Sequence, residues 1–271
     1  MLRRTLLSVG AGLAALLVAA PGGGAAAPQL TATQRRVADE LVSVFENSTT
    51  SIRYGYVENL HDGCGYTAGR AGFCSATGDM LMVVEDYATR RPGNGLVRFL
   101  PVLRRRAADG SASTKGLGSA FVEAWRTASR DAQFRLSQDH IVDVEYFEPA
   151  TRWAGAAGLT TPLGVAIFYD TAIEHGTASD PDSLPSLIAR THHRVGGLPA
   201  NGMDEVRWLT AFLAERRADL LHPHNRARRV DWPESVGRVD ALARLVRAGQ
   251  LNLTPPVKVN PWGDETFALT G

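Results

Sequence analysis

The sequence predicts a mainly α protein that carries one small β-sheet near its N-terminus. Over most of the chain after the first thirty residues, apolar residues recur at the three- and four-residue spacing of amphipathic helices. Residues 54–73 break this pattern, because they are rich in glycine, tyrosine and threonine and are typical of short strands joined by turns. The length of 271 residues suits one domain of two lobes or two small domains.

The first residues have the pattern of a secretory signal. Arg3 and Arg4 precede a mostly apolar run over residues 6–20, and small residues follow it. A transmembrane helix needs about 20 predominantly apolar residues, and this run is shorter and is interrupted by glycine. We therefore expect residues 1–27 to be a signal peptide and residues 28–271 to be a secreted domain that has no membrane partner.

Helical patterns then follow one another along the chain. The first covers residues 31–47, with Thr31 or Thr33 as its N-cap, and the second covers residues 77–89 and stops before a Pro-Gly pair. Further helices are expected over residues 96–108, 119–139, 150–157, 161–175, 184–194, 204–221 and 233–248. The tail 251–271 contains three prolines and is expected to be an extended strap.

Composition and charge exclude some functions. The hydrophobic share of 44% and the charged share of 21% are ordinary for a soluble globular protein. The net charge of +1 argues against a nucleic-acid partner, which usually brings a clear basic excess. His222 and His224 stand two residues apart in a surface loop, but no histidine spacing completes a set of metal ligands. We therefore expect no metal and no cofactor.

Two carboxylates on different elements are the candidate catalytic pair. Glu46 ends the first helix, where the negative end of the helix dipole and partial burial beside Phe45 would raise its pKa, as a general acid requires. Asp62 lies in a turn that Gly63 and Gly65 allow to be sharp. One acid can protonate a glycosidic oxygen while the other activates water. By residue type alone, a solvated glutamate and a turn-forming aspartate are the ordinary alternatives.

A series of short motifs stands in a characteristic order between residues 46 and 256. They are Glu46-Asn47-Ser48, Tyr56-Val57-Glu58, Asp62-Gly63-x-Gly65-Tyr66-Thr67, Gly72-Phe73-Cys74-Ser75-x-Thr77-Gly78-Asp79, Tyr146-Phe147-x-Pro149-Ala150, Tyr169-Asp170, His175-Gly176, Phe212-Leu213-x-x-Arg216, Arg229-Val230-Asp231 and Pro255-Pro256. In this order they closely resemble the family 46 glycoside hydrolases, the chitosanases. The resemblance implies a lysozyme-like fold of two lobes, with the substrate cleft between them, and an endo-acting hydrolysis of β-1,4 bonds in chitosan with inversion.

The resemblance also implies a role for each matched side chain. Glu46 is the general acid, Asp62 is the general base and Thr67 places the attacking water, with the two carboxyl groups roughly 6.5–9.5 Å apart. A charge network that holds the acid is implied for Asp170, Arg216 and Arg229, and the sugar-binding surface for Asn47, Tyr56, Glu58 and Asp79. Carboxylates on that surface would pair with the ammonium groups of glucosamine.

Three departures from the family pattern leave alternatives open. The segment between Glu46 and Asp62 is about two residues shorter than in typical family members, and Cys64 stands where arginine is common. A free Cys64 would leave the base without a nearby positive charge and so with a higher pKa. Cys64 and Cys74 could face each other across a hairpin, but the resemblance favours two free thiols, because the position of Cys74 is usually unpaired.

The third departure concerns the substrate. The loop His222–Arg226 stands where relatives commonly carry acidic substrate contacts. A lysozyme-fold hydrolase of a different or partly acetylated glycan therefore stays an alternative, as does an inactive carbohydrate-binding protein. We expect a monomer acting on chitosan or a related glucosamine polysaccharide.

Overall fold

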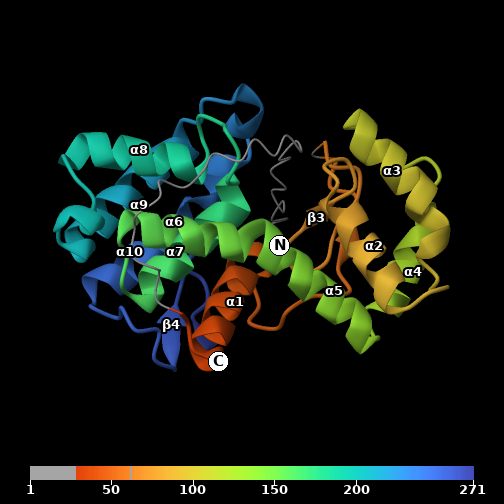
Figure 1. Ribbon diagram of the computed structural model, residues 1–271, viewed down its shortest axis with the longest axis horizontal. Coiled ribbons are helices and arrows are strands. Elements are labelled where there is room, and N and C mark those ends of the chain that lie inside the picture. Colours follow the sequence, from red (N-terminus) through yellow and green to blue (C-terminus); the bar gives the residue numbers. More distant parts are fainter. Residues whose placement is uncertain (1–28, 62) are drawn as a thin grey trace. The chain divides into compact units, whose positions relative to one another are not determined.

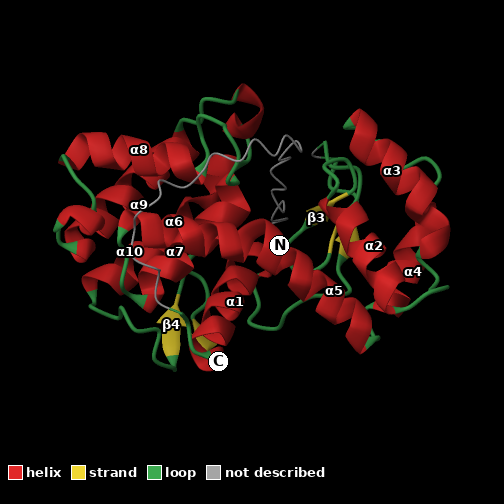
Figure 2. Cartoon of the chain, in the orientation of Figure 1, coloured by secondary structure: helices red, strands yellow, loops and turns green. Residues whose placement is uncertain are grey.

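The structure, a computed structural model, describes residues 29–61 and 63–271 (Figure 1). The expected signal segment 1–27 and the expected base Asp62 therefore lie outside the described residues. The long helices are α1 (Ala32–Asn47), α2 (Asp79–Arg90), α3 (Leu100–Asp109), α4 (Gly118–Ala128), α5 (Ala132–Val142), α6 (Glu148–Ala157), α7 (Pro162–His175), α8 (Leu184–Val195), α9 (Glu205–Leu221) and α10 (Val236–Arg247). Short strands and loops join them, so the expected mainly α fold is confirmed (Figure 2).

The described residues form two compact units. The first, called unit 1 below, is Ile52–Glu145, and the second, unit 2, consists of residues 29–51 together with Tyr146–Gly271. The short π-helix η2 (Asp143–Phe147) contains the boundary. Unit 1 contains the small sheet and α2 to α5, whereas unit 2 contains α1, α6 to α10 and a C-terminal hairpin.

The sheet of unit 1 is short and antiparallel. Its strands are β1 (Val57–Glu58), β2 (Thr67–Ala68) and β3 (Phe73–Cys74), in that spatial order. Thr67 in the middle strand pairs with Glu58 on one side and with Cys74 on the other. The expected sheet within residues 54–73 is confirmed, with β3 extending one residue beyond it.

An aromatic core holds the helices of unit 1 and fixes the start of the sheet. The buried ring of Trp125 lies 4.9 Å from that of Phe134 and 5.9 Å from that of Phe121, centroid to centroid. Its Nε1 donates to the carbonyl oxygen of Tyr54 over 3.1 Å, and the side chain of Gln138 donates to the same oxygen over 2.9 Å. The chain that enters β1 is therefore anchored to α4 and α5.

The expected single helix over residues 119–139 is wrong. The structure divides it into α4 and α5. Asp131 adopts an extended conformation between them and accepts a hydrogen bond from the backbone N–H of Gln133, and this makes it the N-cap of a new helix. The expected helix over residues 96–108 is likewise a 3₁₀ turn, η1 (Val97–Phe99), followed by α3, which has a proline in its first turn.

Unit 2 is built around α7, whose residues from Leu163 to His175 are all buried. The helix packs against α1, α6 and α8. The ring of Phe168 on its buried surface lies 4.9 Å from that of Phe212 and 6.0 Å from that of Trp208, both on α9. Any charged residue of α7 is therefore held inside unit 2, and this positions Asp170 and Glu174.

The C-terminal tail is only partly the strap that the prolines predict. Two of its segments, β4 (Val257–Val259) and β5 (Phe267–Leu269), pair as an antiparallel hairpin whose alternate residues are buried. The backbone N–H groups of Thr270 and Gly271 donate to Glu40 of α1, so the chain end is tied to that helix. Within the described residues, no helix is long and apolar enough to span a membrane.

Candidate active site

Glu46 lies in the last turn of α1, and its side chain is removed from water. Thr31 begins the helix with a capping box, in which its hydroxyl accepts from the backbone N–H of Gln34 and the Gln34 side chain accepts from the N–H of Thr31. Ser48 ends the helix in the left-handed conformation, with φ 52°. Only 6% of the Glu46 side chain is exposed. The burial that the sequence predicted is present.

Four helices place five charged side chains around this end of α1. Arg238 of α10 donates from Nη2 to Oε1 of Glu46 over 2.6 Å and to Oδ1 of Asp170 over 2.8 Å. Asp170 of α7 accepts on Oδ2 from Nη1 of Arg216 of α9, also over 2.6 Å. Glu174, one turn further along α7, forms an ion pair with Nη1 of Arg238. We call these five side chains the acid network.

The acid network favours a protonated Glu46. Burial is the main influence and raises the pKa of its carboxyl, Arg238 opposes this, and Asp170 reinforces it more weakly. With every group ionised, three carboxylates would face two guanidinium groups, leaving one uncompensated negative charge in a buried space. A proton on Glu46 removes that excess. Glu46 is therefore suited to donate a proton, as a general acid must.

The prediction that Arg229 belongs to the acid network is wrong. Arg229 is exposed on the short helix η4 (Arg226–Arg229), and its Nε donates over 3.2 Å to the carbonyl oxygen of Pro223. Arg238 occupies the place in the acid network that the sequence analysis assigned to Arg229. The tripeptide Arg-Val-Asp occurs twice in the sequence, beginning at Arg229 and at Arg238, and the sequence motif alone does not distinguish the two copies. The buried face of α10, which contains Arg238, Val239 and Leu242, is the signal that separates the two.

Thr67 presents a buried, unsatisfied hydroxyl in unit 1. The residue is fully buried in β2, and its Oγ1 has no hydrogen-bond partner among the described residues. A buried hydroxyl that the protein itself leaves unsatisfied can hold a water molecule. This geometry agrees with the expected role of Thr67, which is to place the attacking water. That role stays a prediction.

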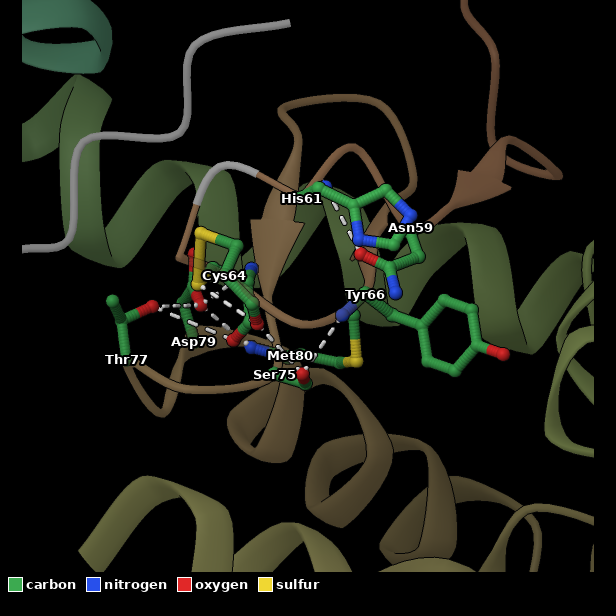
Figure 3. The surroundings of a disulfide bond; sticks show 9 residues. Asn59, His61, Cys64, Tyr66, Ser75, Thr77, Asp79 and Met80 are labelled. Atoms are coloured by element: carbon green, nitrogen blue, oxygen red, sulfur yellow. Dashed lines mark hydrogen bonds between the residues drawn. A yellow bond between two sulfur atoms is a disulfide. The ribbon is translucent and has the colours of Figure 1, made fainter. Parts of the chain in front are cut away.

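A disulfide closes the turn that follows the expected base. Cys64 and Cys74 are bonded, with their Cα atoms 5.1 Å apart (Figure 3). Ser75 adds a second tie between the same segments, because its Oγ donates to the carbonyl oxygen of Cys64 over 2.8 Å and accepts from the N–H of Tyr66 over 3.0 Å. The expectation of two free thiols is therefore wrong, and position 64 cannot act through a free side chain.

Asp79, an expected sugar contact, also organises the turn. Its Oδ1 accepts hydrogen bonds from the backbone N–H of Cys74 and of Met80, each 2.9 Å long, and from the hydroxyl of Thr77 over 2.7 Å (Figure 3). The one carboxylate oxygen therefore fixes the link between β3 and α2. A change at Asp79 must keep this acceptor if it is to report on charge alone.

The other expected sugar contacts divide between the two units. Tyr56 and Glu58 lie with Thr67 and Asp79 in unit 1, and the hydroxyl of Tyr56 donates to Oε2 of the exposed Glu58 over 3.1 Å. Asn47 follows Glu46 in unit 2 and is half-buried. Their contacts with a sugar stay predictions, and so does the expected separation between the carboxyl groups of Glu46 and Asp62.

The loop His222–Arg226 is fastened to the buried carboxylate of Asp182. Oδ1 accepts from the backbone N–H of His224 and lies 2.8 Å from its Nδ1, while Oδ2 accepts from the N–H of Asn225 over 3.0 Å and from Arg228 over 2.7 Å. Burial alone would raise the pKa of Asp182, but these donors lower it to about 2. The carboxylate therefore stays ionised and holds the loop.

The same place gathers three side chains of metal-ligating types. Donor atoms of Asp182, Asp219 and His224 all lie within 4.8 Å of one another. Both oxygens of Asp182 already accept hydrogen bonds from the loop, and Arg190 forms an ion pair with Asp219. The hydrogen bonds of Asp182 fasten the loop, so we assign Asp182 and His224 to loop anchoring, while Oδ2 of Asp219 has no hydrogen-bond partner among the described residues.

The mainly α fold and a buried carboxyl suited to donate a proton agree with the glycoside hydrolase of lysozyme-like fold that the sequence predicts. The profile of glycosyl hydrolase family 46 matches residues 40–257, and the chain belongs to this family. A chitosanase of Bacillus subtilis (strain 168) is 47% identical over 237 residues, which cover 87% of this chain and 85% of the relative. A chitosanase of Streptomyces sp. (strain N174) is 40% identical over 235 residues, covering 85% and 80% respectively.

Solved structures of family members are similar throughout. A complex of the chitosanase of Gynuella sunshinyii with chitotetraose matches with a TM-score of 0.84 and 47% identity, covering 89% of this chain and 99% of that one. A mutant chitosanase of Bacillus subtilis MY002 in complex with 6 GlcN matches with a TM-score of 0.85 and 45% identity, covering 89% and 100%. The first relative is thus seen with chitotetraose and the second with 6 GlcN.

Proposed function

We propose that this chain is a secreted, endo-acting chitosanase that cleaves β-1,4 bonds between glucosamine units with inversion. The observation that carries the proposal is Glu46, a buried carboxyl whose surroundings favour the protonated state, at the position that matches the acid of the family. Relatives that are 47% and 40% identical are chitosanases, and the solved relatives bind chitotetraose and 6 GlcN.

The chemistry assigns one step to each group. Glu46 gives its proton to the glycosidic oxygen as the bond to the anomeric carbon breaks, and the leaving sugar departs as a neutral alcohol. Asp62 takes a proton from the water that attacks the opposite face of the same carbon. Thr67 holds that water through its unsatisfied hydroxyl. Each turnover consumes one water and leaves the two carboxyl groups with exchanged protonation states, which the solvent restores.

The selectivity we propose rests on carboxylates. Glucosamine units carry ammonium groups, and Glu58 and Asp79 are carboxylates that can pair with them. The loop His222–Arg226 contributes no acid and is fastened to Asp182, so it adds no such pairing. We therefore place the ammonium contacts of this chain in unit 1.

The proposal includes export. A disulfide between Cys64 and Cys74 suits an oxidising compartment, and residues 1–27 have the pattern of a secretory signal. We propose that the mature protein works as a monomer. N-terminal sequencing of protein recovered from the medium of an expressing bacterium should find a chain that begins near residue 28, and sedimentation of that protein gives its mass.

A reducing-end assay on chitosans of graded acetylation tests the activity. The purified protein should cleave weakly acetylated chitosan at internal bonds. Glu46→Gln keeps the shape of the acid but not its proton, and Asp62→Asn removes the base, so each should lower turnover by at least about 10²-fold. Glu148→Gln, a change at an exposed glutamate of unit 2, is the matched control and should leave turnover within about twofold.

Three outcomes would contradict the proposal. Turnover within threefold of wild type in either catalytic variant would remove the assigned roles. Cleavage confined to highly acetylated polymer would indicate a hydrolase of another glycan. Binding of the polymer without any release of reducing ends would indicate a carbohydrate-binding protein.

A further inference from the structure

Glu174 is a buried carboxylate that the roles assigned so far do not use. It lies four residues after Asp170 on α7, so both side chains emerge from the same side of a helix that is buried throughout. Only 1% of its side chain is exposed, and it forms an ion pair with Nη1 of Arg238. A fully buried carboxylate is costly unless a cation compensates it, so its presence beside the acid needs an explanation.

The geometry connects Glu174 to Glu46 through a single guanidinium group. Nη2 of Arg238 donates hydrogen bonds to Glu46 over 2.6 Å and to Asp170 over 2.8 Å, and Nη1 forms the ion pair with Glu174. Both carboxylates, Glu46 and Glu174, therefore share the positive charge of Arg238. The negative charge of Glu174 opposes the positive potential of Arg238 at Glu46, so removing that charge makes the net potential at Glu46 more positive.

Counting charges shows the direction of the effect. With Glu46 protonated, the carboxylates of Asp170 and Glu174 balance the guanidinium groups of Arg216 and Arg238. Without the charge of Glu174, the same state would carry one uncompensated positive charge. Ionising Glu46 would then restore neutrality, and the acid would lose its proton more readily.

We propose that Glu174 is a positioning residue whose negative charge offsets Arg238, so that Arg238 can orient Glu46 without stripping it of the proton it must donate. The inference rests on the proposed function, since it names a requirement of the same acid. Arg238 alone would have two opposed effects, because the bond that orients Glu46 also lowers its pKa.

The other ionisable groups of the network do not supply this charge. Asp170 is shared with Arg216, whose Nη1 it binds on Oδ2, so its charge is divided between two cations. His175 follows Glu174 on α7 and is fully buried, and burial together with Arg216 holds the pKa of its imidazole well below the usual range. His175 is therefore neutral, and among the described residues Glu174 is the carboxylate of α7 whose one ion pair is with Arg238.

The test compares variants that share only the loss of charge. Glu174→Gln keeps the shape and a polar end, whereas Glu174→Met fills the same space without polar atoms, so the two variants differ in polarity but share the loss of charge. In both, the alkaline limb of the kcat/KM profile, which Glu46 governs, should move to lower pH by about one unit. Glu174→Asp keeps the charge and should keep the limb within about 0.3 units, whatever its melting temperature.

A second measurement reports on Glu46 without turnover. The infrared band of the protonated Glu46 carboxyl, identified as the band absent from Glu46→Gln, should disappear at lower pH in Glu174→Gln and Glu174→Met than in wild type. If only one of the two neutral variants folds, its limb and its carboxyl band still decide the matter.

The outcomes separate this inference from the proposed function. Wild type that does not cleave chitosan would refute the function, whereas an active wild type whose alkaline limb and carboxyl band stay in place in the neutral variants would refute only the role of Glu174. A loss of melting temperature in all variants, with no movement of the limb, would show that Glu174 merely balances a buried arginine.

Discussion

Replacing Arg238 with methionine should destabilise the protein strongly, whereas the same change at Arg229 should not. Arg238 is 3% exposed and contacts three carboxylates, and its guanidinium carbon also lies 5.4 Å from the centre of the Phe45 ring. Methionine keeps the apolar stem, but within the acid network it leaves only Asp170 with a paired guanidinium group, that of Arg216. Removing one partner of a buried ion pair costs about 3–5 kcal/mol.

Arg229→Met is the matched control for this experiment. Arg229 is exposed, and the bond it donates goes to a backbone carbonyl of Pro223. Exposed substitutions of this kind usually change stability by no more than about 0.5 kcal/mol. Urea unfolding at pH 7 measures both free energies. The cost of Arg238→Met should shrink as pH falls, because protonation relieves the repulsion among the carboxylates it leaves behind.

The same variant also tests the electrostatics of the acid. Arg238 lowers the pKa of Glu46 against the effect of burial, so its removal should raise that pKa. The alkaline limb of the kcat/KM profile should therefore move to higher pH in Arg238→Met, the opposite direction to Glu174→Gln. Equal costs for the two arginine variants, or a cost below about 1 kcal/mol at Arg238, would refute the assignment of Arg238 to the network.

Two further predictions concern single aspartates. Asp79→Asn keeps the oxygen that accepts from Cys74 and Met80 but removes the negative charge. It should therefore reduce cleavage of glucosamine polymer more than cleavage of highly acetylated polymer. Equal losses on the two polymers would show that Asp79 only shapes the turn. Asp182 has its pKa lowered from 3.8 to about 2, so its ionised form contributes about 2 kcal/mol of stability that is present above pH 3.8 and is lost as pH falls towards 2. In Asp182→Asn, urea unfolding should show a correspondingly smaller loss of stability over that range, and an unchanged slope would contradict the reasoning.

Much of the fold follows from local sequence, because the signals are local. The helix that ends at Glu46 begins at the expected cap, Thr31, and its apolar face is buried as the periodicity predicts. The break between α4 and α5 was missed, since the apolar spacing continues across it and only Asp131 marks the new start. Asp131 fits the continuous helical spacing of the sequence, so its role as an N-cap becomes clear only from its extended backbone conformation.

The acid network was harder to predict because its contacts are distant in sequence. Arg238 and Glu46 are 192 residues apart, and nothing in the local sequence of either names the other. The family motif supplied Asp170 and Arg216, whose pairing is present. The repeated tripeptide Arg-Val-Asp made the second arginine ambiguous, and Glu174 lies between the family motifs Tyr169-Asp170 and His175-Gly176, so no motif predicts its charge.

The cysteines show two arguments from the sequence in conflict, and the geometric one is right. Family resemblance favoured a free Cys74, whereas the expected hairpin placed Cys64 close enough to bond to it, and the structure contains that bond. A disulfide is as uncharged as a protonated thiol, so the bond itself brings no charge that could tune the expected base Asp62. The disulfide acts instead on stability, because closing a loop of about ten residues lowers the conformational entropy of the unfolded chain, which stabilises the folded state by roughly 3 kcal/mol. The disulfide therefore ties Cys64, two residues after the expected base Asp62 in the sequence, to β3.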